Sequence, residues 1–245
     1  MIRVNMLKSR ETMIKRKKNM KRTYIILVLS LMAIAVCKAQ NNDSRWSLVP
    51  KIGLNLTNHS QFKAQIGFSG GADINYQLTP DWTLTTGATY AFHQMGYQSG
   101  TIPMPDARND DAHIQVGRLE VPLMVGYRLV DHLSLKAGLR AAIRLHSDMT
   151  DVYQETVNYD LRVIYQSDNS LETDALCLTL PIALTYETGA WVFDLSYAFG
   201  LNKVSYTIHQ NERSSYITFP HERTFVIAGK PVNVLQLTVG YRLPL

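Results

Sequence analysis

Cysteine is scarce in this chain of 245 residues, which contains only Cys37 and Cys177. Cys37 lies in a leader that we expect to be removed, and the single thiol left behind cannot form an internal disulfide. The sequence also lacks Cys/His spacings typical of zinc sites, a phosphate-binding loop and a dinucleotide fingerprint. We therefore expect no metal site, no cofactor and a fold that is stabilised without disulfides.

A hydrophobic run long enough for a membrane-spanning helix is missing as well. The longest run, residues 24–36, has 13 residues, whereas a spanning helix needs roughly 20. It follows Lys21 and Arg22, and small residues at Cys37 and Ala39 suit cleavage between Ala39 and Gln40. The pattern predicts a secretory signal peptide.

The expected domain organisation is a leader over residues 1–39, with the functional signal at about 20–39, followed by one domain over residues 40–245. Met20 is an alternative to Met1 as the true start, because residues 1–19 show no part of a signal pattern. A lipidated Cys37 is a competing interpretation, which the bulky Val36 before it disfavours.

Positive charge is scarce outside the leader. The chain carries 25 Lys and Arg against 20 Asp and Glu, but ten of these bases and one of these acids lie within the first 39 residues. The remainder has 15 basic and 19 acidic residues, a net charge of −4. The expected mature chain therefore lacks the basic surface of a nucleic-acid-binding protein, and we expect no nucleic-acid partner.

Alternation of apolar and polar residues dominates the rest of the sequence, and no amphipathic helix is evident. A period of two is typical of β-strands with one apolar face. It predicts eight strands, at Trp46–Leu56, Ala64–Leu78, Trp82–Phe92, Leu119–Leu129, Leu133–Leu145, Leu176–Tyr186, Trp191–Leu201 and Leu235–Leu245.

The lengths of the connections favour a membrane barrel over a soluble sandwich. Short turns at Pro80, Asp131 and Gly189 alternate with connections of about 16, 30 and 30 residues. Strands of about 9 to 11 residues match the hydrocarbon thickness when they are tilted. We expect an all-β fold, an eight-stranded antiparallel up-and-down transmembrane β-barrel with short periplasmic turns and long outer loops.

Recurring strand endings resemble a known family. The segments GADINYQL, VPLMVGYRL, LPIALTYE and the terminal LQLTVGYRLPL are similar to strands of small outer-membrane β-barrels of Bacteroidetes, of the PorT-like and OmpA/OmpX-like kind. The resemblance covers about residues 46–245 and implies location in the outer membrane of a Gram-negative cell. It also implies assembly by the barrel-assembly machinery, contact with outer-membrane lipid and lipopolysaccharide, and a monomer. Such proteins usually end in an aromatic residue, whereas this chain ends in Leu245.

The period of two also predicts which charges face the lumen. An eight-stranded barrel is narrow enough for side chains to fill it, and charges in such a space must pair. We expect a structural ion-pair network, with a conductive or ligand-binding lumen as the alternative. The predicted interior bases are Lys51, Arg118, Arg128, Lys136, Arg140, Arg144 and Arg242, and the acids are Asp73, Glu120, Glu187 and Asp194.

We expect the functional residues to lie in the long loops. Two of them hold ten acids, which indicate a solvated surface or a site for cations or a basic partner: Asp106, Asp110, Asp111, Asp148, Asp151, Glu155, Asp160, Asp168, Glu172 and Asp174. The loop segments DVYQETVNYDLRVIYQ and VSYTIHQNERSSYITF predict hairpins that turn at NYD and at NERS. Protruding hairpins with open edges are natural docking sites.

We expect a non-enzymatic surface-interaction, adhesion or secretion-assembly protein, whose protein partner binds the outer loops or the periplasmic turns. A lipid A-modifying enzyme is the alternative, because such catalysis needs a His, a Ser and a carboxylate at one rim. The candidates are His93, His146, His209 and His221 with Ser99 and Ser147, but no spacing selects one set. A narrow channel is a further alternative, and no catalytic, cofactor or metal residue is assigned.

Overall fold

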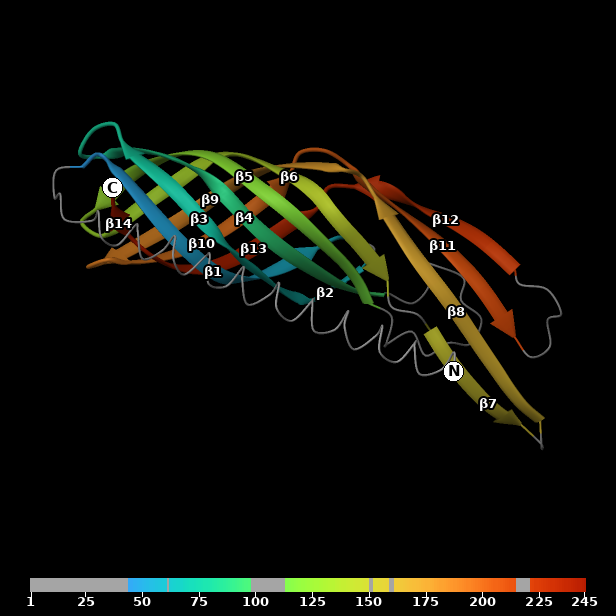
Figure 1. Cartoon of the computed structure of the whole chain (residues 1–245). Coiled ribbons are helices and arrows are strands. Elements are labelled where there is room, and N and C mark those ends of the chain that lie inside the picture. Colours follow the sequence, from blue (N-terminus) through green and yellow to red (C-terminus); the bar gives the residue numbers. More distant parts are fainter. Residues whose placement is uncertain (1–43, 61, 98–112, 150–151, 159–160, 215–220) are drawn as a thin grey trace, which may run out of the picture. The chain divides into compact units, whose positions relative to one another are not determined.

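The computed structural model describes residues 44–60, 62–97, 113–149, 152–158, 161–214 and 221–245 (Figure 1). The expected leader and its cleavage site lie outside these ranges. Arg45–Arg242 form one compact unit, and the short strand β14 (Leu243–Pro244) belongs to another. The described residues include no helix that is both long and apolar enough to cross a membrane.

Eight long strands form a closed antiparallel barrel, as predicted. Each of these strands is hydrogen-bonded to the barrel strand on either side of it. The barrel closes because the first strand also pairs with the last, from Lys51 opposite Gly240 to Asn58 opposite Asn233. A short strand β2 (Phe62–Ala64) pairs with the loop-side part of the third barrel strand. The barrel strands are β1 (Trp46–Asn58), β3 (Ile66–Gln77), β4 (Trp82–Tyr97), β5 (His113–Val130), β6 (Leu133–Met149), β9 (Leu176–Thr188), β10 (Trp191–Gly200) and β13 (Asn233–Tyr241).

The predicted strand boundaries were wrong mainly at one end of the barrel. β4 runs five residues beyond Phe92, and β5 begins at His113 instead of Leu119. The reason is that inward apolar residues such as Met95 and Ile114 continue the alternation after the outward apolar face has ended. The last barrel strand ends at Tyr241, before the predicted Leu245.

Three tight connections define what we call the turn end of the barrel: residues 78–81, 131–132 and 189–190. Gly189 has a φ of 58°, a left-handed conformation that glycine adopts without steric cost. His132 has a φ of 72°, which is uncommon for a residue with a side chain. The opposite end is called the loop end, and there the connection between β1 and β2 is also short.

The outward faces of the barrel strands carry the apolar residues that the alternation predicts. Leu123 and Leu139 are 58% and 55% exposed, while their neighbours Met124 and Arg140 are buried. Exposed apolar side chains recur on all eight strands, far more than the surface of a soluble protein carries. Lipid is the solvent that such a surface suits.

A second sheet forms from the two hairpins at the loop end. It contains β7 (Val152–Asn158), β8 (Leu161–Thr173), β11 (Val204–Ser214) and β12 (His221–Lys230), in the order β12-β11-β8-β7 (Figure 1). Both predicted hairpins are present. The predicted turn at NERS was wrong, because residues 211–214 belong to β11 and pair with β8. We call these four strands the outer sheet.

Candidate functional site

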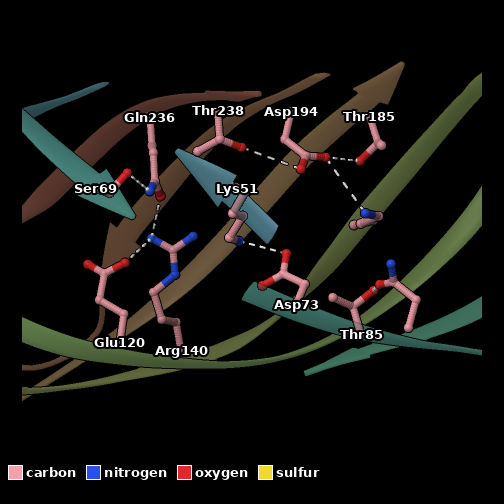
Figure 2. A network of polar contacts seen from close by, with 12 residues as sticks. Lys51, Ser69, Asp73, Thr85, Glu120, Arg140, Thr185, Asp194, Gln236 and Thr238 are labelled. Carbon is pink, nitrogen blue, oxygen red and sulfur yellow. Dashed lines mark hydrogen bonds and ion pairs between the residues drawn. The ribbon is translucent and has the colours of Figure 1, made fainter. Parts of the chain in front are cut away.

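The lumen of the barrel holds a network of ion pairs (Figure 2). All four acids that the alternation placed inside are paired with predicted interior bases. Lys51 Nζ lies 2.6 Å from Asp73 Oδ2, and Arg242 pairs with Glu187 nearer the turn end. The expectation of a structural network is therefore met by the described residues.

Glu120 is the centre of one part of this network. Its Oε2 lies 3.2 Å from Arg140 Nη1, and its Oε1 lies 3.3 Å from His93 Nε2. Arg140 also donates to Gln236 Oε1 at 3.1 Å, and Gln236 donates to Ser69 Oγ at 2.9 Å (Figure 2). Five barrel strands, β3, β4, β5, β6 and β13, are thereby joined across the lumen by charge-assisted and neutral hydrogen bonds.

Asp194 is the centre of a second part. Lys136 Nζ lies 3.6 Å from its Oδ1, the Thr185 hydroxyl donates to Oδ1, and the Thr238 hydroxyl lies 3.5 Å from Oδ2 (Figure 2). Neutral partners such as Thr185, Thr238 and Gln236 were not singled out from the sequence. Their inward orientation could have been predicted, because they occupy inward positions of the same alternation.

Three of the seven interior bases have no acid partner among the described residues. Arg128 is exposed near the turn end, and Arg144 is half-buried and donates to Ser147 Oγ at 3.2 Å. Arg118 is different, because its side chain is only 4% exposed and no carboxylate of the described chain lies within 4 Å.

An apolar cluster lies on the loop side of the network. Inward residues of the barrel strands and of β8, β11 and β12 meet in it: Phe62, Met95, Ile114, Val116, Met149, Leu171, Val204, Tyr206, Ile208 and Ile227, with smaller residues around them. His59 packs edge-on against Tyr206, with ring centroids 5.2 Å apart. The cluster was not predicted from the sequence, because the predicted barrel strands ended before Met95 and began after Ile114.

Burial in this cluster changes the acidity of its polar members. Burial, reinforced by the charge of Lys230, lowers the pKa of His59 to about 4. Burial likewise raises the pKa of Tyr206 to about 12. At neutral pH both rings are therefore uncharged, which suits their apolar surroundings.

A polar pocket of about 480 Å³ opens at the turn end. It is lined by Arg128, Asp131, His132, Ser134, Glu187, Gly189 and Arg242. Acidic and basic groups are balanced there, and Arg242 is already bound to Glu187. The pocket offers hydrogen-bonding groups but no set of convergent unpaired charges.

The residues proposed for lipid A chemistry do not converge where the structure describes them. His93 points into the lumen and contacts Thr57 Oγ1 at 2.7 Å and Glu120. His146 is exposed on the outward face, whereas its neighbour Ser147 donates to the Leu171 carbonyl at 2.6 Å. His209 contacts Thr224 Oγ1 at 3.1 Å in the outer sheet.

Ser99 lies outside the described residues, as does the side chain of His221. Adjacent strand residues such as His146 and Ser147 point to opposite faces, so their proximity in sequence cannot make a catalytic pair. No group of three His, Cys, Asp or Glu that could hold a metal ion occurs among the residues that the structure describes.

Most of the ten loop acids are outside the described side chains. Three are described, and they serve local roles or face solvent. Asp148 Oδ1 accepts from the Met149 amide at 2.8 Å, Asp174 Oδ2 accepts from the Ser205 amide at 2.8 Å, and Glu172 is exposed. These three do not form a cation site.

A family model for the outer membrane protein beta-barrel domain matches residues 38–206. The chain belongs to this outer membrane β-barrel family. The match covers most of the closed barrel described above, so the outward apolar face of this outer membrane barrel protein meets the lipid of the outer membrane. No curated protein matches the chain.

Solved outer-membrane proteins are also similar to this barrel protein. Neisserial surface protein A is 11% identical, with 82% of this chain and 98% of that chain covered and a TM-score of 0.39. Ail of Yersinia pestis is 15% identical, with 80% and 97% covered and a TM-score of 0.39. A major outer membrane protein of Thermus thermophilus is 11% identical, with 80% and 99% covered and a TM-score of 0.47.

Proposed function

We propose that this outer membrane barrel protein is a non-enzymatic anchor that presents the outer sheet to a protein partner outside the cell. The observation that carries the proposal is the pairing of β8 with β11, which joins two hairpins into one four-stranded sheet. Two hairpins that pair with each other form a more rigid surface than two separate loops. The proposed role is adhesion or secretion assembly.

The two outermost strands of this sheet offer a mode of binding. In the part of the chain that the structure describes, no further strand pairs with β7 or with β12. Unpaired backbone groups at a sheet edge can accept an added strand from a partner. Val226 of β12 is 70% exposed and would lie within such an interface.

The lumen supports an anchor better than a channel. The described side chains of the lumen include paired charges and, on the loop side, an apolar cluster, which is a poor lining for an ion path. The alternative of lipid A modification has no observation in its favour, since the described His and Ser residues are separated.

Orientation is tested with two epitope tags on otherwise unchanged protein in intact cells. A tag after Asn158, at the tip of the β7–β8 hairpin, should be labelled by antibody without permeabilisation. A tag at Asp131, at the turn end, should be labelled only after permeabilisation. Labelling in the reverse pattern would overturn the outside location of the outer sheet.

Partner binding is tested with a photo-crosslinking amino acid at Val226. Irradiation of intact cells should give a specific adduct whose partner is identified by mass spectrometry. The matched control carries the same amino acid at Leu139, which faces lipid at similar exposure. Identical adducts at both positions, or none at Val226 under conditions where the protein is folded, would contradict the proposal.

A further inference from the structure

The charges inside the barrel do not balance, and the imbalance is concentrated at one residue. The four interior acids are each bound to a base, so three bases remain. Arg128 is exposed and Arg144 is half-buried, so water can solvate both. Arg118 is 4% exposed and stands in β5 between the ion-pair network and the apolar cluster. No described carboxylate lies within 4 Å of it, and a buried cation without an ion-pair contact is strongly unfavourable.

The groups beside Arg118 do not supply that counter-charge. Its guanidinium is close enough to interact with the Tyr206 hydroxyl and the Cys177 thiol. The Tyr206 hydroxyl carries no negative charge at neutral pH, and burial raises its pKa further, to about 12. Arg118 Nε and the Tyr206 hydroxyl nonetheless have no hydrogen-bond partner of normal geometry.

Two further hydroxyls without partners lie on the strands around this point. Thr173 is directly opposite Tyr206 across the β8–β11 pair, and its Oγ1 is buried without a hydrogen bond. Thr179 occupies the next inward position after Cys177 on β9, and its Oγ1 is also unbonded. Buried polar atoms without partners are few in native proteins, and an unassigned ion or water usually accounts for them. Four of the ten such atoms among the described residues belong to Arg118, Tyr206, Thr173 and Thr179.

We infer that Arg118 and Tyr206 hold a small monovalent anion of the halide class at the boundary between the lumen network and the apolar cluster. The guanidinium would provide the charge and an N–H donor, and the Tyr206 hydroxyl would provide a second donor. Thr173, which lies directly opposite Tyr206, would offer a further hydroxyl. Tyr206 and Thr173 belong to the outer sheet, but both are buried, so the inference does not depend on a partner binding there.

The side chains around Arg118 favour an anion that carries a single charge and is weakly hydrated. Glu120 follows Arg118 at the next inward position of β5, and its negative charge would repel a dianion such as sulfate. Val116, the inward residue on the other side, is fully buried in the apolar cluster. An anion that keeps its water tightly would lose too much hydration there. Chloride and bromide fit these limits better than sulfate or phosphate.

The test is anion-dependent thermal stability of the full mature barrel in detergent. Protein is refolded in chloride, bromide or gluconate at constant ionic strength, and the temperature at which the folded gel band is lost is measured. The midpoint should rise with chloride or bromide and then saturate, but it should not respond to gluconate. A wild-type midpoint that is the same in all three salts would overturn the inference.

Variants assign the effect to the site. Tyr206→Phe removes one donor at nearly constant volume and should raise the half-saturating chloride concentration roughly five- to tenfold. Arg118→Met should abolish the chloride response, whereas Arg144→Gln, the matched control, should keep it. A chloride response that is unchanged in both Arg118→Met and Tyr206→Phe would place the anion elsewhere.

Crystals grown in bromide give a readout that does not depend on whether Arg118→Met folds. Anomalous scattering of the unmodified protein should show a peak between the Arg118 guanidinium and the Tyr206 hydroxyl. The same peak should be absent from Tyr206→Phe crystals or much weaker in them. Ordered wild-type crystals with no bromide peak at this position would refute the site.

Discussion

Neighbouring residues of one strand face different solvents. Leu139 points to lipid and Arg140 points into the lumen network. Leu139→Arg should lower the free energy of unfolding by roughly 2–4 kcal/mol, because the charge would face the hydrocarbon near the middle of the membrane. Arg140→Gln removes the cation from the buried Glu120, but His93 still contacts Glu120 and the new amide can donate a hydrogen bond, so its cost should lie below the roughly 3–5 kcal/mol of a fully broken buried pair.

Urea unfolding in lipid vesicles measures both changes, with Leu139→Phe as an apolar control that should stay within about 0.5 kcal/mol of the unmodified protein. Equal destabilisation by Leu139→Arg and Leu139→Phe would argue against lipid contact at this position.

The pair of Lys51 and Asp73 tests whether the interior charges depend on each other. Lys51→Met would leave a buried carboxylate without its cation, and removing one partner of a buried pair costs about 3–5 kcal/mol. Lys51→Met combined with Asp73→Asn should recover much of this loss. A double-mutant cycle gives the coupling free energy. Strictly additive effects would show that the two side chains do not stabilise each other.

At the scale of elements, the register between the two hairpins can be trapped covalently. Glu172 of β8 lies directly opposite Thr207 of β11, and both are accessible. Cysteines introduced at this pair, in a Cys177→Ala background, should form a disulfide under mild oxidation, because opposed strand residues have suitable Cα separations.

The control places the cysteines at Glu172 and Val226, one strand further away in the same sheet. Two strand spacings amount to roughly 9–10 Å, beyond the reach of a disulfide. Electrophoresis without reducing agent should show a cross-linked product for the first pair only. Failure of the first pair to cross-link in folded protein would contradict the β8–β11 pairing.

At the scale of the whole molecule, closure of the barrel leaves none of its eight strands with an open edge. Every barrel strand is hydrogen-bonded on both sides, so detergent has no exposed sheet edge at which to begin unfolding. The mature chain should therefore migrate at one position on an SDS gel without boiling and at another after boiling. A single position under both conditions, with recovery in the soluble fraction, would be incompatible with a closed membrane barrel.

Much of the barrel could be predicted because one rule governs it. Successive residues of a barrel strand face lipid and the narrow lumen in turn, so they must alternate between apolar and polar. This alternation appears in the sequence as a period of two. It located eight strands and placed Asp73, Glu120, Glu187 and Asp194 inside. The same rule failed near Met95 and Ile114, because the inward residues there are apolar and the outward apolar face has ended.

Local alternation was enough to predict the number of barrel strands, the face of each strand that meets lipid and the set of charges in the lumen. Which of these groups meet could not be predicted, because contacts such as Arg140 with Gln236 join residues 96 positions apart and depend on the register at which the barrel closes. The same holds for the pairing of β8 with β11 and for Arg118, because the lack of a described carboxylate within 4 Å of its guanidinium is a property of the closed lumen and of no short segment.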